Sequence, residues 1–200
     1  VAGLNLPPSI RVDYGGLYAE QTKSFADLAM VFAAAVLLVA LLLTYMFERP
    51  AFTFSALTTV ALSAASVMTG LWLTGTELDI SALMGLTMVV GMVTELIIFL
   101  LAELKPGSAV TPEALRLAGH HRLRPILMSA LIAILTLLPL ALGISRGAGL
   151  QKPLATAIIF GLAAAVPLVL IFMPAMLHLI EDRLRRKPVS AEMRLDEGVT

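Results

Sequence analysis

Glu95 is the residue of this sequence that most needs a chemical reason, because it interrupts an apolar stretch over residues 80–103. At about 1.5 Å of rise per residue, it lies about 6 Å from the middle of a helix formed by that stretch. A carboxylate at this depth in a bilayer is costly, so it is expected to face other helices or an aqueous path. We interpret Glu95 as a proton-coupling residue. The alternative is a neutral structural glutamic acid that is hydrogen-bonded to a carbonyl of a neighbouring helix.

Three methionines precede Glu95 at four-residue steps, which place them on the same helical face: Met84, Met88 and Met92. Thioethers on one face suit a path for a soft metal ion such as Cu(I). Methionine also fills irregular gaps between packed helices, and this packing role is the favoured interpretation.

Ser129 supplies a hydroxyl group near the start of another apolar stretch. Its hydrogen bond either crosses to a partner helix or returns to its own turn, and the sequence leaves both alternatives open. His120 and His121 are adjacent, so on a helix they point about 100° apart and cannot clamp one metal together. We expect them to be surface residues.

The motifs of several enzyme classes are absent from this sequence. It contains neither His-Glu-x-x-His nor Gly-x-Ser-x-Gly, and it has no glycine-rich phosphate loop. There is no cysteine to form a disulfide or a thiolate metal site. We therefore expect no enzymatic activity, no bound metal and no cofactor, and energy for any transport must come from an ion gradient or another chain.

The elements that must position these side chains are membrane helices. Hydrophobic residues make up 58% of the 200 residues and the mean hydropathy is +0.92, so lipid must surround most of the chain. A helix needs about 20 apolar residues to cross a bilayer, and unsatisfied backbone is too costly there for other structures. The sequence predicts an all-α membrane protein with five spans, over 28–47, 53–74, 80–103, 125–145 and 154–180.

The basic residues predict the orientation of these spans. Only four of the 14 Lys and Arg residues fall on one side of the membrane: Arg11, Lys23, Arg146 and Lys152. The side with the larger number is expected to be cytoplasmic, which leaves the N-terminus outside and the C-terminus inside. The net charge of zero argues against a nucleic-acid partner.

The regions outside the spans are assigned as follows. Residues 1–27 contain an alternating strand pattern over 10–14 and then a polar helical lead-in, and we expect them to end an extracytoplasmic domain. In the long connection before the fourth span, Thr111 is a capping residue followed by Pro112 and Glu113, which predicts a short surface helix over about 112–122. Residues 183–200 are expected to form a solvated cytoplasmic tail.

Four stretches resemble resistance-nodulation-division (RND) efflux permeases, in the order and at the spacing typical of that family. They are Leu73 to Leu101, Arg122 to Ala130 with Leu137 to Gly143, Gly147 to Ala155, and Leu6-Pro7-Pro8 with Tyr14-Gly15-Gly16. The resemblance covers the chain up to about Lys187. It implies helices eight to twelve of a twelve-helix, proton-driven exporter of the bacterial inner membrane, preceded by the last strand of a periplasmic porter domain.

The resemblance also implies roles and partners. Glu95 occupies the position of a basic residue on helix ten, and Ser129 that of a hydroxyl on helix eleven, so Glu95, Thr94 and Ser129 are the expected proton-coupling residues. The implied partners are the missing half with helices one to seven and the porter domain, two further copies in a homotrimer, a periplasmic adaptor protein and an outer-membrane channel.

Two departures from the drug-exporting pattern stand side by side. Glu95 replaces the usual lysine, and Leu96 follows where asparagine is common. Copper and silver exporters of the family carry an acid at the position of Glu95. The stretch from Gln151 to Ala155 is also more similar to the heavy-metal branch. We therefore expect part of an exporter of metal ions or hydrophobic compounds. The alternative is a non-transporting membrane scaffold or accessory protein derived from an RND permease half.

Overall fold

The computed structural model describes residues 17–47, 50–104, 111–144, 148–180 and 182–183, and the regular structure within them is helical. Five helical segments are long and apolar enough to cross a membrane. The α-helices are α1 (Leu17–Phe47), α2 (Pro50–Leu73), α3 (Ile80–Leu101), α4 (Pro112–Ala141) and α5 (Lys152–Pro167). The predicted all-α membrane fold is confirmed. The strand predicted over 10–14 and nearly all of the predicted tail lie outside the described residues.

Local sequence signals explain where two of the helices begin. The side chain of Asp79 caps α3, because its Oδ1 accepts a hydrogen bond from the backbone N–H of Ala82 at 2.8 Å. The expected cap of α4 is also present, with Thr111 Oγ1 accepting from the N–H of Ala114 at 3.2 Å. Each cap satisfies a backbone donor that the first helical turn leaves without an intrahelical partner.

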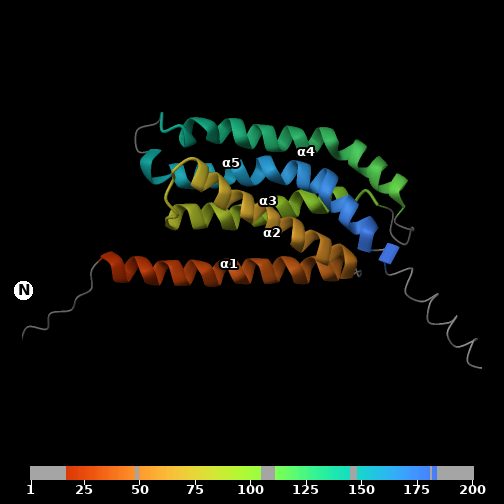
Figure 1. The fold of residues 1–200 in the computed structure, drawn as a ribbon, viewed down its shortest axis with the longest axis horizontal. Coiled ribbons are helices and arrows are strands. Elements are labelled where there is room, and N and C mark those ends of the chain that lie inside the picture. The colour runs from red at the N-terminus through yellow and green to blue at the C-terminus, as the bar shows by residue number, and fades with distance from the viewer. Residues whose placement is uncertain (1–16, 48–49, 105–110, 145–147, 181, 184–200) are drawn as a thin grey trace, which may run out of the picture.

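The junction before the fourth span differs from the sequence prediction. The surface helix expected over 112–122 and the span expected from residue 125 form one continuous helix, α4, with Pro125 inside it. Proline removes one backbone donor, but helical bonding continues on both sides, so α4 bends without ending there (Figure 1). Leu115 and Ala118 are buried, which anchors the first turns of α4 against the bundle.

The core of the bundle lies among α2, α3 and α5, while α1 and α4 flank this group on opposite outer sides (Figure 1). α5 packs against α2, α3 and α4 and so joins most of the bundle. Two glycines permit this close packing. A Cβ at Gly85 would lie 2.9 Å from the carbonyl oxygen of Leu154, and one at Gly161 would lie 2.5 Å from Val89.

The fifth span changes its helical pitch partway. After Pro167, residues Leu168–Phe172 form a π-helical turn (η2), and the chain is α-helical again over 173–180. The backbone N–H of Met173 bonds to the carbonyl of Leu168, one residue further back than in an α-helix. Pro174 then has no N–H to donate, so two prolines bracket the wide turn.

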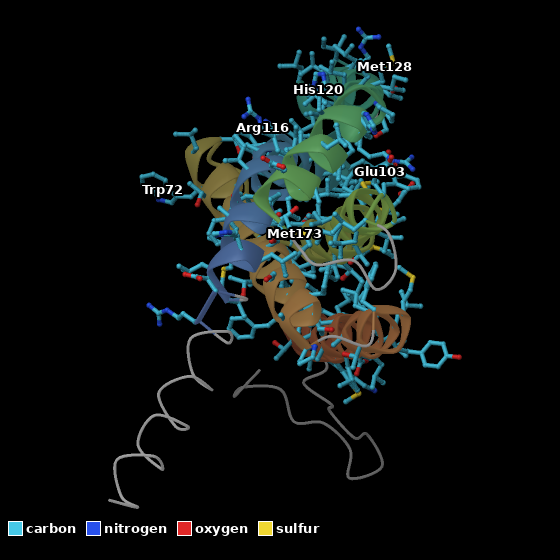
Figure 2. The ribbon with its side chains drawn as sticks, turned by 90° about the vertical axis from the view of Figure 1, so that its right-hand side faces the viewer. Trp72, Glu103, Arg116, His120, Met128 and Met173 are labelled. Carbon is cyan, nitrogen blue, oxygen red and sulfur yellow. The ribbon has the colours of Figure 1, made fainter. Side chains whose placement is uncertain are left out.

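The outer surface of the bundle is apolar, as a lipid-facing surface should be. Large exposed aromatic residues lie near helix ends, with Tyr45 close to the end of α1 and Trp72 close to the end of α2. Figure 2 shows Trp72 projecting away from the ribbon. Tyrosine and tryptophan favour the two membrane interfaces, and consecutive antiparallel helices place these two at opposite interfaces.

We predict that Gly85→Val destabilises the bundle by about 1–3 kcal/mol, because the added atoms would press on the backbone of α5. The measurement is the apparent thermal unfolding midpoint in detergent of the protein that contains this chain. Ala61→Val, at an exposed position of α2, is the matched control and should change stability by no more than about 0.5 kcal/mol. Equal midpoints for the two variants would contradict the close α3–α5 contact.

Candidate functional site

α3 has two unlike faces. Its buried face includes Val89, Val93 and Ile97, which pack into the bundle core. The opposite face is exposed and follows three- and four-residue steps along the helix; we call it the outer face of α3, made of Met84, Met88, Gly91, Glu95 and Phe99. Such spacing places all five side chains on one side of an α-helix. A Cβ at Gly91 would meet nothing within 4 Å, so no neighbouring element of the described residues covers this face there.

Glu95 lies on this outer face, exposed, and about 9 Å along the axis from the end of α3 at Leu101. Among the described residues it forms no hydrogen bond or ion pair. The alternative of a structural glutamic acid bonded to a neighbouring carbonyl therefore has no partner within this part of the chain. Its neighbour Leu96 points the other way and is buried in the core.

The structure divides the three methionines. Met84 and Met88 are 50% and 52% exposed, and they share the outer face with Glu95. Met92 is only partly exposed and packs against the hydrophobic core. Two thioethers thus lie on the face of the carboxyl group, and the third contributes to helix packing.

The two hydroxyl candidates do not join Glu95 in a hydrogen-bonded group within the described residues. Thr94 is only 5% exposed, and its Oγ1 donates to the carbonyl of Val90 at 2.6 Å inside the bundle. Ser129 is exposed on α4, and its Oγ donates to the carbonyl of Ile126 at 3.1 Å. Of the two alternatives left open for Ser129, the structure therefore has the bond back to its own turn.

A charged cluster that the sequence interpretation missed joins the end of α3 to α4. Glu103 Oε2 accepts a hydrogen bond from Nε of Arg122 at 2.8 Å and forms an ion pair with an Nη atom of Arg122 at 2.8 Å. Glu103 Oε1 lies 3.2 Å from Nδ1 of His121. The hydrogen bond with His121 and then that from Arg122 lower the pKa of Glu103. The available signal was an acid after α3 and two basic residues within α4, but a sequence separation of 18 and 19 residues concealed the contact.

Comparisons with known proteins place this arrangement in a larger context. The profile of the AcrB/AcrD/AcrF family matches residues 1–181. The swarming motility protein SwrC of Bacillus subtilis is 32% identical over 193 residues, and the nickel and cobalt resistance protein CnrA of Cupriavidus metallidurans is 32% identical over 183 residues. These alignments cover 94% and 90% of this chain but 18% and 17% of the relatives, so the chain spans less than a fifth of their length.

A crystal structure of a heavy metal efflux pump has a similar fold and sequence. It superposes with a TM-score of 0.74 and 32% sequence identity, covering 89% of this chain and 18% of the pump. The two proteins are therefore similar in sequence as well as in fold.

We predict that the cluster of Glu103, His121 and Arg122 holds the end of α3 against α4 in a pH-dependent way. Because the pKa of Glu103 is lowered, the link is complete above the ordinary value of 4.5 and is lost as the pH falls through the lower folded-state pKa. The chain has no native cysteine, so spin labels at introduced cysteines in place of Ala102 and Leu117 can report the α3–α4 distance.

Glu103→Gln should broaden that distance distribution at neutral pH, and wild type should broaden only at acid pH. Glu113→Gln, which changes an exposed acid on α4 outside the cluster, is the control and should leave the distribution narrow. A narrow distribution in Glu103→Gln at neutral pH would show that the cluster does not hold the two helices.

Proposed function

Because the chain belongs to the AcrB/AcrD/AcrF family, we propose that it forms part of a proton-driven efflux transporter of the bacterial inner membrane. The resemblance to RND permeases, with its lean toward the heavy-metal branch, is confirmed by the family match and by the likeness to CnrA and to the heavy metal efflux pump. The proposed cargo is a metal ion or a hydrophobic compound. Coupling to protons is inferred from the outer face of α3.

The observation that supports this proposal is the exposure of Glu95 at membrane depth. Glu95 is exposed, and no described residue forms a hydrogen bond or an ion pair with its carboxyl group. A carboxylate in direct contact with lipid tails is unfavourable by a few kcal/mol or more, whereas one that faces protein or water is tolerated. We infer that further helices of the complete transporter cover the outer face of α3 and leave an aqueous path to Glu95.

The surroundings of Glu95 on that face suit a titrating group. One turn away, Gly91 presents no side chain, so a covering helix can approach α3 closely. When Glu95 is protonated, the outer face is neutral and apolar helices can pack on it. When Glu95 is ionised, the same face requires a cation or water. Proton uptake and release would thus favour two different arrangements of α3 and its covering helices, which is the requirement for coupling.

The orientation and partners belong to the same proposal. The connection between α2 and α3 would lie outside, and the connection between α3 and α4 would lie in the cytoplasm, as the distribution of basic residues favours. Residues 1–27 would then end a periplasmic porter domain, and residues 183–200 would form a cytoplasmic tail.

We propose a homotrimer that works with a periplasmic adaptor protein and an outer-membrane channel. Seven further helices would supply the cover of α3.

The competing proposal is a membrane scaffold or accessory protein that does not transport. It is motivated by the departure at Leu96, where asparagine is common in the drug-exporting pattern. The two proposals differ in one measurable property. A transporter moves protons when its substrate is present, and a scaffold moves none for any substrate.

We predict that Glu95→Gln in the complete protein lowers proton-coupled efflux by about tenfold or more, a change of about 1.4 kcal/mol in the coupled step. Glutamine keeps the size and hydrogen-bonding capacity of the side chain but cannot ionise. The measurement is substrate-dependent proton movement in proteoliposomes under a fixed pH gradient.

Glu77→Gln, an exposed acid in the connection between α2 and α3, is the matched control and should transport like wild type. Wild-type efflux by the Glu95→Gln protein would remove the coupling role. Absence of proton movement in the unmodified protein, with every substrate class tested, would favour the scaffold.

A soft-metal path along the outer face of α3 is the second candidate role, favoured by the exposure of Met84 and Met88 beside Glu95. It predicts that the double variant Met84→Leu with Met88→Leu lowers copper and silver resistance while efflux of organic compounds persists, because leucine keeps the volume but lacks sulfur. Met68→Leu, exposed on α2, is the control. Unchanged resistance in the double variant would leave these methionines a packing role only.

A further inference from the structure

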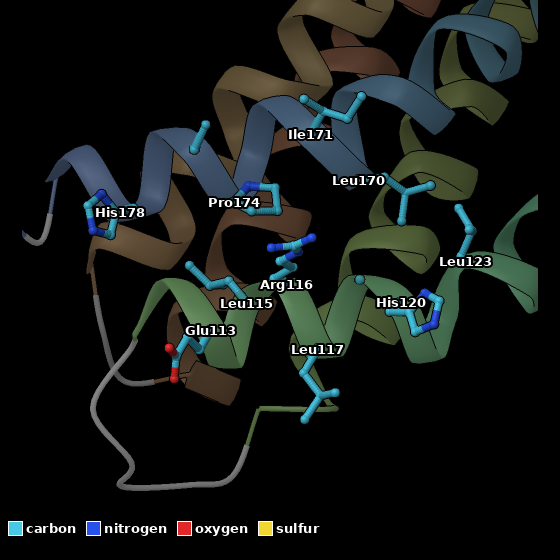
Figure 3. Close-up of a pocket in the computed structure, with 12 residues that line it drawn as sticks. Glu113, Leu115, Arg116, Leu117, His120, Leu123, Leu170, Ile171, Pro174 and His178 are labelled. Atoms are coloured by element: carbon cyan, nitrogen blue, oxygen red, sulfur yellow. The ribbon is translucent and has the colours of Figure 1, made fainter.

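A cavity of about 910 Å³ lies between the first turns of α4 and the last turns of the fifth span. Figure 3 shows the two helices as its opposite walls, with Arg116 from α4 between them. Leu115 and Leu123 contribute to one wall, and Leu170 and Pro174 to the other. The cavity is therefore mainly apolar in its walls but has a permanent cation within it.

The polar groups of the cavity are predominantly basic. Arg116 is joined by His120 and His178, which Figure 3 shows toward opposite ends of the cavity, and Glu113 is the single acid in the lining. Within the described residues, Arg116 forms no ion pair or hydrogen bond. Its guanidinium donors, together with ring N–H groups that each histidine offers in either protonation state, are suited to an anion with several oxygen acceptors.

The position of the cavity in the fold selects among anions. It lies at the end of the bundle where α4 begins and the fifth span ends, which is where a membrane-spanning helix meets the headgroup region. Its wall includes Leu170 and Ile171 of the π-helical turn η2, so apolar side chains line the cavity on the membrane side of Arg116. A free phosphate ion would contact only the basic groups, whereas a phospholipid would contact both the basic and the apolar residues of the lining.

We propose that this cavity binds one anionic phospholipid, with the phosphate against Arg116 and an acyl chain along Leu170 and Ile171. Basic pockets between membrane helices recognise headgroups in this way, by charge at the headgroup and apolar contact below it. The inference requires only that the bundle spans a bilayer. It is independent of the transport proposal, because lipid binding is measured without substrate or a proton gradient.

The test is native mass spectrometry of the complete protein in detergent, titrated with phosphatidylglycerol and, separately, with phosphatidylcholine. Wild type should bind one phosphatidylglycerol in preference to phosphatidylcholine. Arg116→Gln should weaken that binding by about fivefold, the loss expected for one interfacial cation. Arg116→Lys, which keeps the charge, should recover most of the affinity and guards against an effect of misfolding.

Arg124→Gln is the matched control, since Arg124 is an exposed arginine of α4 that does not line the cavity. It should change the affinity by less than about twofold. Equal losses in Arg116→Gln and Arg124→Gln, equal binding of the two lipids, or no bound lipid in wild type would each overturn the proposal. Displacement of phosphatidylglycerol by millimolar inorganic phosphate would also overturn it, because it would identify a soluble anion as the occupant.

Discussion

The cost of placing a carboxyl group at membrane depth is the constraint on which the rest of this structure depends. α3 satisfies its apolar requirement on one side by packing Val89, Val93 and Ile97 into the bundle, and it turns Glu95 to the other side. Lipid cannot be a favourable neighbour for that side. One face of α3 is thus covered by other helices of the bundle, whereas we expect the face with Glu95 to require further protein. The length of the relatives, more than five times that of this chain, agrees with this expectation.

The other helices hold α3 in this orientation. α5 lies against α3 through Gly85 and Gly161, where close approach leaves little freedom for α3 to rotate and bury Glu95. At the end of α3, Glu103 is tied to Arg122 of α4. By contrast, the fifth span widens into a π-helical turn between Pro167 and Pro174 beside the cavity that contains Arg116. The packed contacts thus lie on the side of α3 away from Glu95 and at the end of α3, and the irregular backbone lies partway along the fifth span.

Much of the fold was predictable because apolar length and capping residues are local properties. Thr111 predicted the start of α4, and five apolar stretches predicted five helices. The break expected near Pro125 was wrong, because burial of Leu115 and Ala118 favours continued helix over the local preference of proline. Helical spacing grouped Met92 with Glu95, yet tertiary packing turns Met92 toward the core. The contact of Glu103 with His121 depends on how two helices meet, and no local pattern contains that information.

We propose that protein or water, and not lipid, covers the outer face of α3 in the complete protein. A structure of the whole protein in a lipid nanodisc, determined by electron cryomicroscopy, tests it most directly. We expect side chains from helices outside this chain, or ordered water, within about 4 Å of Glu95 and Met88. Acyl-chain density lying along the outer face, with Glu95 against it, would contradict this proposal.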